Sequence, residues 1–491
     1  MIIKLNRTLG ALPPEVAAPR YDLRAVSPAI VHIGLGGFHR AHFARYTHDL
    51  MNSDPTALSW GIVGAGLRRS DSDLLTALHR QQGLYTLVER NHEGETKTLI
   101  GSLIDTIDAS QSSDALLAAI DRPATRIVSI TVSEHGYHLA GATRTLNLND
   151  AAILDDIAHH NAPRTMPGIL VEGLRRRKQS GRPAFTAMSC DNIQHNGRVL
   201  RDAVLALAAA SDTTLAEWIA THGCFPSSMV DRITPVPLPE QIEAFNDATR
   251  VADEAPVFAE TFRQWVIEDR FADGRPDWDR VGAQFVDDVT PYETMKLRLL
   301  NASHLAIAGL GVLCGYETVI DTIGDPLIRR YMVRLMDAET GPTVPPVPGI
   351  DLTAYKSSLL DRFANPAIRD TVRRINADAP VNLLLDPLRD RLAADASIDL
   401  LALGLAAWCK RVVVEASLPV EGRLMGRAEA RLQQQARIAT DDPAAFLAID
   451  EIFGPVGRDT RLLSAIDHWL QSFGDYGVGG TLSHAAAEGL F

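Results

Sequence analysis

The chain of 491 residues is poor in cysteine and in long apolar runs. Its cysteines, at positions 190, 224, 314 and 409, form no C-x-x-C pair, which argues against a disulfide framework and against a zinc knuckle. The longest apolar runs, such as residues 400–408, are too short to cross a bilayer. The first residues lack the apolar stretch of a secretory signal. We therefore expect a cytoplasmic protein with no membrane partner.

Basic charge is also scarce. Lys and Arg number 48 against 61 Asp and Glu, which gives a formal net charge of −13 at pH 7. Because nucleic acids and anionic membranes select basic surfaces, neither is an expected partner. The one dense basic run, residues 175–178, precedes Gly181 and is interpreted as a solvated helix end. A small molecule is the expected partner, and the oligomeric state stays open, with a monomer compatible with the sequence.

Metal ligands form no recognisable pattern either. Several histidines lie between residues 135 and 195, but no pair has ligand spacing together with a third ligand that the sequence can place. We interpret them as surface or loop residues. No metal site is expected.

The composition is that of a soluble globular protein, with 46% hydrophobic and 22% charged residues, and the length allows two or three domains. Strand and helix patterns alternate in the first half, with strands expected at 29–33, 60–64, 84–89, 96–100, 126–132 and 184–188. This alternation predicts a doubly wound α/β domain of Rossmann type over residues 1–285. Residues 221–288 look irregular and are interpreted as a loop-rich bridge.

Helical patterns dominate the second half. They cover residues 292–314, 326–338, 352–361, 367–375, 383–393, 400–412 and 444–452. The chain is therefore predicted to end in a mostly α-helical domain over residues 286–491. We expect this domain to close on the sheet domain.

A glycine turn follows the first strand of the sheet domain. Gly34 permits a tight turn, and Gly36 lets backbone N–H groups approach a pyrophosphate at the start of the next helix. The third glycine of the usual fingerprint is replaced by His39. We expect Gly34, Gly36, Gly37, Phe38 and His39 to contact a dinucleotide, although His39 could instead be a packing residue.

Polar residues also follow the later strands. Asp71 comes after the second strand and is the candidate partner of the adenosine ribose of NAD. The neighbouring Arg68 and Arg69 could receive a 2′-phosphate, so NADP is not excluded. Glu134 and Asn192 follow two further strands, at the edge where open α/β sheets bind ligands.

The segment from Met295 to His304 is the expected centre of the chemistry. Residues Thr290 to Glu293 form a capping box that predicts a helix starting near Pro291. At ~100° per residue, Lys296, His304 and Asn301 project at roughly 0°, 80° and 140°, all on one side of a regular helix. A desolvated lysine could take the proton of an alcohol while amide groups stabilise the alkoxide. The alternative is a surface helix with solvated polar residues.

Four motifs together give the chain a family resemblance. They are Gly34-Leu35-Gly36-Gly37-Phe38-His39, Ser189-Cys190-Asp191-Asn192, Met229-Val230-Asp231-Arg232-Ile233 and Lys296-x4-Asn301-x2-His304. Over residues 25–485 the chain resembles the polyol-specific long-chain dehydrogenases of the mannitol dehydrogenase family. The lysine segment and the Ser-Cys-Asp-Asn loop are much more specific than the glycine turn.

The resemblance implies a metal-independent, nicotinamide-dependent oxidation of a secondary alcohol to a ketose. It implies Lys296 as general base, Asn192 and Asn301 as residues that hold the reacting oxygen, and His304 as a ligand of a neighbouring hydroxyl. Glu293 would relay the proton, a role that competes with capping. As adjacent opposite charges, Asp231 and Arg232 suggest a structural role. The family motif that contains them adds Asp231 to the expected substrate-binding residues. Arg374 matches the first basic residue of the family's sugar pocket.

The substrate is the most open question at this stage. The resemblance favours D-mannitol and D-fructose, as in mannitol 2-dehydrogenase. Fructuronate and mannonate, as in fructuronate reductase (D-mannonate oxidoreductase), or another polyol such as sorbitol or arabinitol are the alternatives, and Arg374 could serve a substrate carboxylate. A non-catalytic NAD(H) sensor is the hypothesis from a different class.

Overall fold

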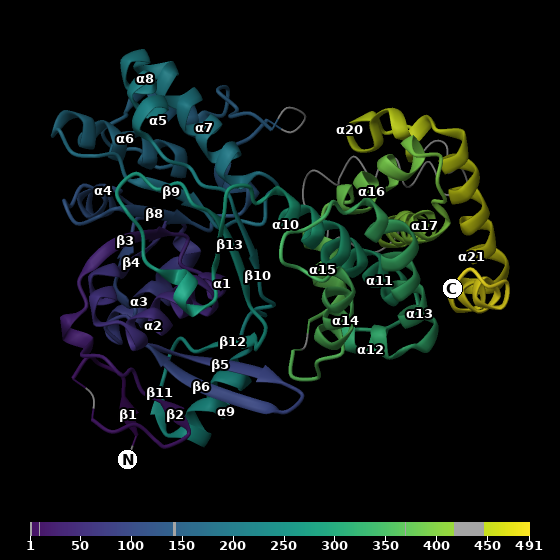
Figure 1. Cartoon of the computed structure of the whole chain (residues 1–491), viewed down its shortest axis with the longest axis horizontal. Helices are drawn as coiled ribbons and strands as arrows, with labels where there is room; N and C mark the ends of the chain where they lie inside the picture. The colour runs from purple at the N-terminus through teal and green to yellow at the C-terminus, as the bar shows by residue number, and fades with distance from the viewer. Residues whose placement is uncertain (1, 9, 141–143, 369, 417–445) are drawn as a thin grey trace. The chain divides into compact units, whose positions relative to one another are not determined.

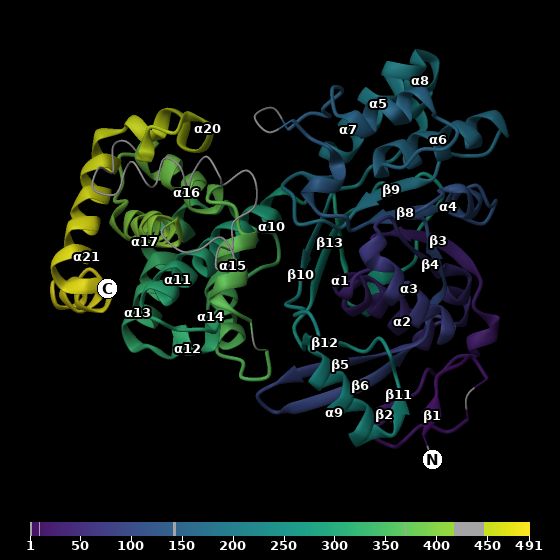
Figure 2. The ribbon, with the colours of Figure 1, turned by 180° about the vertical axis from the view of Figure 1, so that it is seen from behind.

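The computed structural model describes residues 2–8, 10–140, 144–368, 370–416 and 446–491, and Figures 1 and 2 show it from opposite sides. It divides into two compact units, Met1–Val289 and Thr290–Phe491, here called unit 1 and unit 2. The expected helix at 444–452 begins outside the described residues; helix α20, Asp450–Phe453, covers its end.

Unit 1 is built around a five-stranded sheet in the order β7-β4-β3-β8-β9. All neighbouring strands are parallel. The strands are β3 (Pro28–Ile33), β4 (Gly61–Gly66), β7 (Leu103–Asp108), β8 (Ile127–Ile130) and β9 (Thr186–Ser189). Their carboxyl ends therefore lie at one edge of the sheet, where ligands of open α/β sheets bind.

Both faces of this sheet are buried because neighbouring residues of a strand point to opposite sides. In β8, Ile127 belongs to one hydrophobic core and Val128 to the other. The first core contains the aromatic side chains Phe43, Trp265 and Trp278. Helices α4, α6, α7 and α8 supply the second core, and Figure 1 shows α6 and α7 on one side of β8 and β9.

The helices of unit 1 are mostly those expected between strands. They are α1 (Gly37–Ala41), α2 (Phe43–Ser53), α3 (Ser72–Arg80), α4 (Asp114–Ile120), α5 (Ala151–Ala158), α6 (Met166–Gln179), α7 (Asn196–Ser211), α8 (Thr213–His222) and α9 (Pro239–Thr249). The single helix expected after the glycine turn is wrong, because His42, with φ −116° and ψ −82°, separates α1 from α2.

Two other sequence interpretations of unit 1 need correction. The strands expected at 84–89 and 96–100 are present as β5 (Tyr85–Asn91) and β6 (Gly94–Ile100), but they do not join the doubly wound sheet. They form an antiparallel hairpin in a separate sheet of order β12-β5-β6-β2. Residues 221–288 are not a bridge. They contain several short strands: β10 (Ser228–Asp231), β11 (Val251–Ala252), β12 (Val257–Glu260), β13 (Gln264–Glu268) and β14 (Gln284–Val286). β11 pairs with β1 (Ile3–Lys4), and β6 pairs with β2 (Val16–Ala17).

Unit 2 is helical, and its described residues contain no β-strand. Its helices are α10 (Thr290–Met295), α11 (Ala302–Leu313), α12 (Val319–Gly324), α13 (Pro326–Arg334), α14 (Leu352–Phe363), α15 (Val372–Asp378), α16 (Asn382–Ala393), α17 (Asp399–Ala416), α20, and α21 (Thr460–Ala487). Segments Lys296–Asn301 and Leu335–Thr340 are π-helical. The predicted fold class, a Rossmann-type α/β domain followed by a mostly α-helical domain, is confirmed.

Helix α11 is the central element of unit 2. It is buried along most of its length and packs against α17. A glycine of each helix allows this approach: a Cβ atom at Gly404 of α17 would lie 3.1 Å from the Cβ of Ala306, and one at Gly309 would lie 3.5 Å from the backbone nitrogen of Trp408. Asn376 of α15 donates to the Ala308 carbonyl at 3.0 Å and fixes α15 on α11. Within the described ranges of both units, no helix is long and apolar enough to cross a membrane.

Candidate active site

The glycine turn follows β3 and is shaped for close approach of a ligand. Gly34 has a φ of +93°, and a Cβ atom there would lie 2.0 Å from the Thr131 carbonyl oxygen, so only glycine fits. A Cβ atom at Gly36 would meet only the Gly34 carbonyl oxygen, at 3.8 Å. Gly34, Gly36, Gly37 and Phe38 are all partly exposed. This open side fits the pyrophosphate of a dinucleotide.

His39 places its side chain in the core instead. The ring is fully buried and stacks on His32 of β3, with 3.5 Å between centroids, and on Phe43 of α2 at 5.1 Å. Among the described residues neither ring nitrogen of His39 has a hydrogen-bond partner, and burial holds its pKa well below the ordinary value. His39 therefore packs helix on strand, the task of the third glycine in the usual fingerprint. Only its backbone is available to a cofactor.

The end of β4 carries charges of both signs. The Asp71 carboxylate forms an ion pair with Arg68 at 3.0 Å and accepts its backbone N–H at 3.3 Å. The Arg68 side chain is 77% exposed, and Arg69 is exposed as well. A carboxylate suits the ribose hydroxyls of NAD, whereas exposed arginines suit the 2′-phosphate of NADP.

The loops after β8 and β9 lie side by side because these strands pair in parallel. After β8, Ser133 adopts a φ of +62°, and exposed Glu134 begins a short 3-10 turn that ends at Tyr137. After β9 comes buried Asp191, followed by exposed Asn192. The structure thus brings Glu134 and Asn192 to the same edge of the sheet as the glycine turn.

Asp231 ends β10 and is buried, and its chain neighbour Arg232 anchors this end of the strand. The Arg232 guanidinium is wholly buried and donates to the carbonyl oxygens of Ala41 and Glu260, the latter from Nε at 2.9 Å. It also forms an ion pair with Glu89 of β5. Arg232 therefore ties α1, β5 and β12 to the backbone beside Asp231, which supports the structural interpretation of this arginine.

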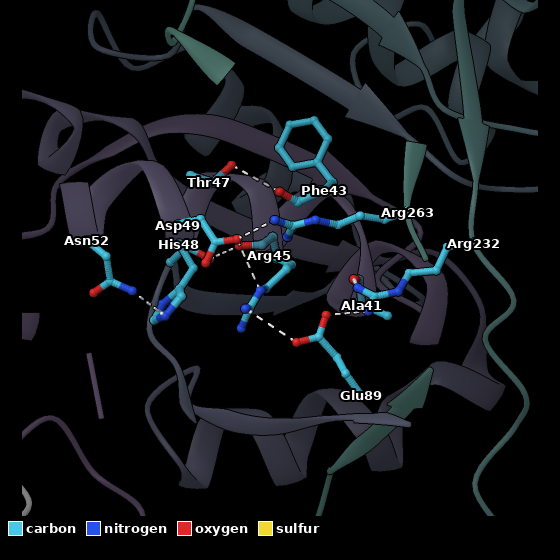
Figure 3. A network of polar contacts seen from close by, with 12 residues as sticks. Ala41, Phe43, Arg45, Thr47, His48, Asp49, Asn52, Glu89, Arg232 and Arg263 are labelled. Carbon is cyan, nitrogen blue, oxygen red and sulfur yellow. Dashed lines mark hydrogen bonds and ion pairs between the residues drawn. The ribbon is translucent and has the colours of Figure 1, made fainter. Parts of the chain in front are cut away.

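Figure 3 shows that this ion pair belongs to a larger network of charged side chains, the outer members of which are partly exposed. Arg45 of α2 contacts Glu89 at 3.3 Å and Asp49 at 3.2 Å, and Arg263 contacts Asp49 at 2.7 Å. Burial lowers the pKa of Arg232, and the Glu89 carboxylate opposes that shift. The arginines and carboxylates of this network therefore alternate, so that each of these charges near the end of β10 has a partner of opposite sign.

The lysine segment of unit 2 is helical but not regularly α-helical. Residues Lys296–Asn301 form π turns, and the backbone N–H of Ala302 donates to the Leu297 carbonyl, five residues back. The predicted angle of roughly 140° between Lys296 and Asn301 is therefore wrong, because it assumed α-helical spacing. A turn closed by such bonds holds roughly one residue more than the 3.6 of an α-helix, so residues five apart come nearly one turn apart. Lys296 and Asn301 lie closer to one face than expected.

The predicted site residues of unit 2 lie on consecutive turns from α10 to α11. Lys296 is 8% exposed, and Asn301 and His304 are partly exposed. The His304 ring stacks on Phe363 of α14, with 4.6 Å between centroids. Glu293 is buried in α10, one turn before Lys296. Unit 2 thus presents a lysine, an amide and an imidazole along one helical segment.

Arg374 lies on α15, which packs against α11. Its guanidinium forms an ion pair with the buried Asp370, with Nε donating to Oδ1 at 2.7 Å and Nη2 to Oδ2. A substrate carboxylate at this arginine would have to share it with Asp370. Within the part of the chain that the structure describes, no group of three or more His, Cys, Asp or Glu residues could hold a metal ion.

Sequence reasoning missed two side chains at the sheet edge. Asp191 belongs to the Ser189–Asn192 motif without a predicted role, and Tyr137 belongs to none of the motifs. Their hydroxyl and carboxylate meet at 2.8 Å across 54 residues of sequence. The sequence does contain one indication of the role of Asp191: it is an acidic residue directly before the candidate Asn192, and it follows a strand that the pattern predicts to be buried.

Comparison with known proteins agrees with this arrangement. Residues 28–280 match the mannitol dehydrogenase Rossmann domain, and residues 288–473 match the mannitol dehydrogenase C-terminal domain. The chain is 45% identical to the D-mannonate oxidoreductase of Escherichia coli (strain K12), over 80% of this chain and 82% of that protein. It is 40% identical to the polyol:NADP oxidoreductase of Gluconobacter oxydans (strain 621H), over 82% of this chain and 84% of that protein.

A solved structure matches over the whole chain. The ternary complex of Pseudomonas fluorescens mannitol 2-dehydrogenase with NAD and D-mannitol is 40% identical, covers 99% of this chain and 100% of its own, and gives a TM-score of 0.90. Both domain matches, the full-length structural match and the lysine segment lead to one conclusion. The chain belongs to the mannitol dehydrogenase family and is an oxidoreductase.

Proposed function

We propose that the chain is a nicotinamide-dependent polyol dehydrogenase that interconverts a secondary alcohol and a ketose, with D-mannitol and D-fructose as the leading pair. The observation that carries the proposal is the series Lys296, Asn301 and His304 on one helical segment, in which π turns set the lysine and the amide nearly one turn apart. The likeness to mannitol 2-dehydrogenase, solved with NAD and D-mannitol, supports D-mannitol as the alcohol of this pair.

In this proposal Lys296 is the general base. Its side chain is 8% exposed, so the amine lies in the interior, where it can receive a proton away from bulk water. As the hydride leaves the carbinol carbon, Lys296 takes the hydroxyl proton, and the amide N–H groups of Asn192 and Asn301 donate to the developing alkoxide. His304 binds a neighbouring hydroxyl, with its ring held against Phe363. Asp231 completes the substrate contacts, and Glu293 passes the proton onward.

The cofactor proposed is NAD. The open side of the glycine turn at Gly34, Gly36, Gly37 and Phe38 would hold its pyrophosphate, and Asp71 would accept from the adenosine ribose hydroxyls. Glu134 lies at the same sheet edge. When bound, the nicotinamide supplies the hydride acceptor. NADP is the alternative, because Arg68 and Arg69 are exposed beside Asp71 and because one relative is named for NADP.

A sugar acid is the second candidate substrate. It is supported by the 45% identity to a D-mannonate oxidoreductase and by Arg374, whose guanidinium could bind a carboxylate. Against it, Asp370 already occupies one edge of this guanidinium. We therefore place the polyol first.

The test is a set of initial rates read from nicotinamide absorbance. Fructose and fructuronate are each offered with NADH and with NADPH. The proposal predicts the fastest turnover with fructose and NADH. Faster fructuronate reduction would move the assignment to sugar acids and give Arg374 the role of carboxylate ligand, and cofactor binding without turnover on any polyol or sugar acid would favour a sensor.

A further inference from the structure

Asp191 occupies an unusual position for a carboxylate. It is 7% exposed, lies two residues after the end of β9, and precedes the exposed Asn192. Buried carboxylates are costly unless they are hydrogen-bonded. The contacts that compensate this cost all come from the loops at the carboxyl edge of the sheet.

The Asp191 side chain holds the loop after β8. Its Oδ1 accepts the backbone N–H of Ser133 at 2.8 Å, and its Oδ2 accepts the N–H of Val132 at 3.2 Å. The Tyr137 hydroxyl donates to Oδ2 at 2.8 Å. Ser133 has a φ of +62° and a ψ of 170°, a conformation that costs a non-glycine residue on the order of 1–3 kcal/mol. The carboxylate therefore restrains a strained backbone.

The main chain of Asp191 holds the turn around Asn192. Its carbonyl accepts the N–H of Ile193 at 2.9 Å and the Asn196 side-chain amide at 3.0 Å. Its own N–H donates to Ser189 Oγ at 3.2 Å. Asn192 is thus the middle residue of a tight turn whose first residue is fixed through both its backbone and its side chain.

The restrained loop also contacts the glycine turn. The Thr131 hydroxyl, directly before Val132, donates to the Gly34 carbonyl at 2.8 Å. The space that a Cβ atom at Gly34 would need is filled by the Thr131 carbonyl. A continuous chain of contacts therefore joins the Asn192 turn, the Ser133 loop and the glycine turn.

We propose that Asp191, together with Tyr137, is a positioning residue that keeps the Asn192 amide in register with the Ser133 loop and the dinucleotide turn. The proposal rests on the proposed function of Asn192 in holding the reacting oxygen. The carboxylate is needed because it offers an acceptor to each of two adjacent N–H groups. An asparagine offers one acceptor oxygen, and its NH₂ group would face one of the backbone N–H donors.

The test compares Asp191→Asn with a matched control, Asp253→Asn. Asp253 is also a buried carboxylate of unit 1 that accepts backbone N–H groups, from Thr86 at 2.6 Å and Ala255 at 2.9 Å, but it adjoins no candidate site residue. Both variants lose the same kind of hydrogen bonds. Tyr137→Phe is the milder variant, because it removes only the hydroxyl.

At equal folded fraction, Asp191→Asn is expected to lower kcat for fructose about 100-fold, the loss typical of an ångström-scale displacement, with KM changed only a few-fold. Tyr137→Phe is expected to lower kcat by a smaller factor, and Asp253→Asn to keep the kcat of the wild type. The inference is overturned if Asp191→Asn and Asp253→Asn have the same kcat.

Amide hydrogen exchange tests the inference independently of turnover, including the case in which the proposed function fails. In Tyr137→Phe, exchange should become faster at Val132 and Ser133, whose N–H groups donate to the Asp191 carboxylate, and also at Ile193, whose N–H donates to the Asp191 carbonyl, because one residue holds both loops. Faster exchange confined to residues 132–137 would overturn the positioning role.

Discussion

Replacing Arg232 with methionine should lower the free energy of unfolding of unit 1 by about 3 kcal/mol. The guanidinium is wholly buried, donates to the carbonyls of Ala41 and Glu260, and pairs with Glu89. Removing one partner of a buried ion pair typically costs about 3–5 kcal/mol, since the other charge is left behind in the interior. The lower end applies here because Arg45 remains 3.3 Å from Glu89.

The assay is urea unfolding followed by tryptophan fluorescence and circular dichroism, together with thermal melting. At roughly 2–4 °C for each kcal/mol, the melting temperature should fall by roughly 6–12 °C. Arg270→Met is the matched control, since Arg270 also pairs with a glutamate, Glu268, but is 67% exposed, and such a pair contributes at most about 1 kcal/mol. If Arg232→Met unfolds within 1 kcal/mol of the wild type, the network in Figure 3 does not stabilise the fold as argued.

Further predictions concern the sheet edge. Gly36→Ala should keep the wild-type melting temperature, because the new Cβ atom meets nothing closer than 3.8 Å in the fold. It should bind NADH about tenfold more weakly in a fluorescence titration, because this atom fills the side open to the pyrophosphate. Unchanged affinity would place the cofactor elsewhere. Ser133→Gly should raise the free energy of unfolding by about 1 kcal/mol in urea titrations, because glycine tolerates the positive φ at this position, and a loss of stability would contradict the strain argument. Burial raises the pKa of Asp191 to about 6. The folded state therefore keeps a proton that the unfolded state releases above about pH 4. As a result, the free energy of unfolding should fall by about 3 kcal/mol as the pH rises from 4 to 6. Asp191→Asn should remove this part of the pH dependence of urea unfolding, and an unchanged slope would show that Asp191 does not cause it.

Patterns that depend on neighbouring residues could be predicted from the sequence. The apolar strand before Gly34 and the caps around Pro291 act locally, so the glycine turn and the start of the lysine helix follow from residue types alone. Strand and helix alternation likewise predicts the class of the first domain, and a series of helical patterns predicts that of the second. The strands between residues 221 and 288 were missed because they are short and their pairing partners are distant, as in β10 with β13 and β12 with β5.

Features that depend on tertiary contacts could not be predicted. The π turns between Lys296 and Asn301 replace α-helical bonds without a proline or glycine to mark them. The glycine motif leaves both a cofactor role and a packing role open for His39, and only the tertiary structure shows its ring stacked on His32 in the core. The Asp191 and Tyr137 pair is separated by 54 residues and forms only when β8 and β9 align.

The most direct test of the proposed chemistry is the turnover of Lys296→Ala with fructose and NADH. The proposal predicts a kcat about 10²- to 10⁴-fold below that of the wild type, with NADH affinity and melting temperature kept, because only the general base is lost. Lys356→Ala is the control, since Lys356 lies on α14 and pairs with Asp337 outside the predicted site, and it should retain full turnover. A Lys296→Ala enzyme that turns over within tenfold of the wild type would contradict the assignment of Lys296 as the base.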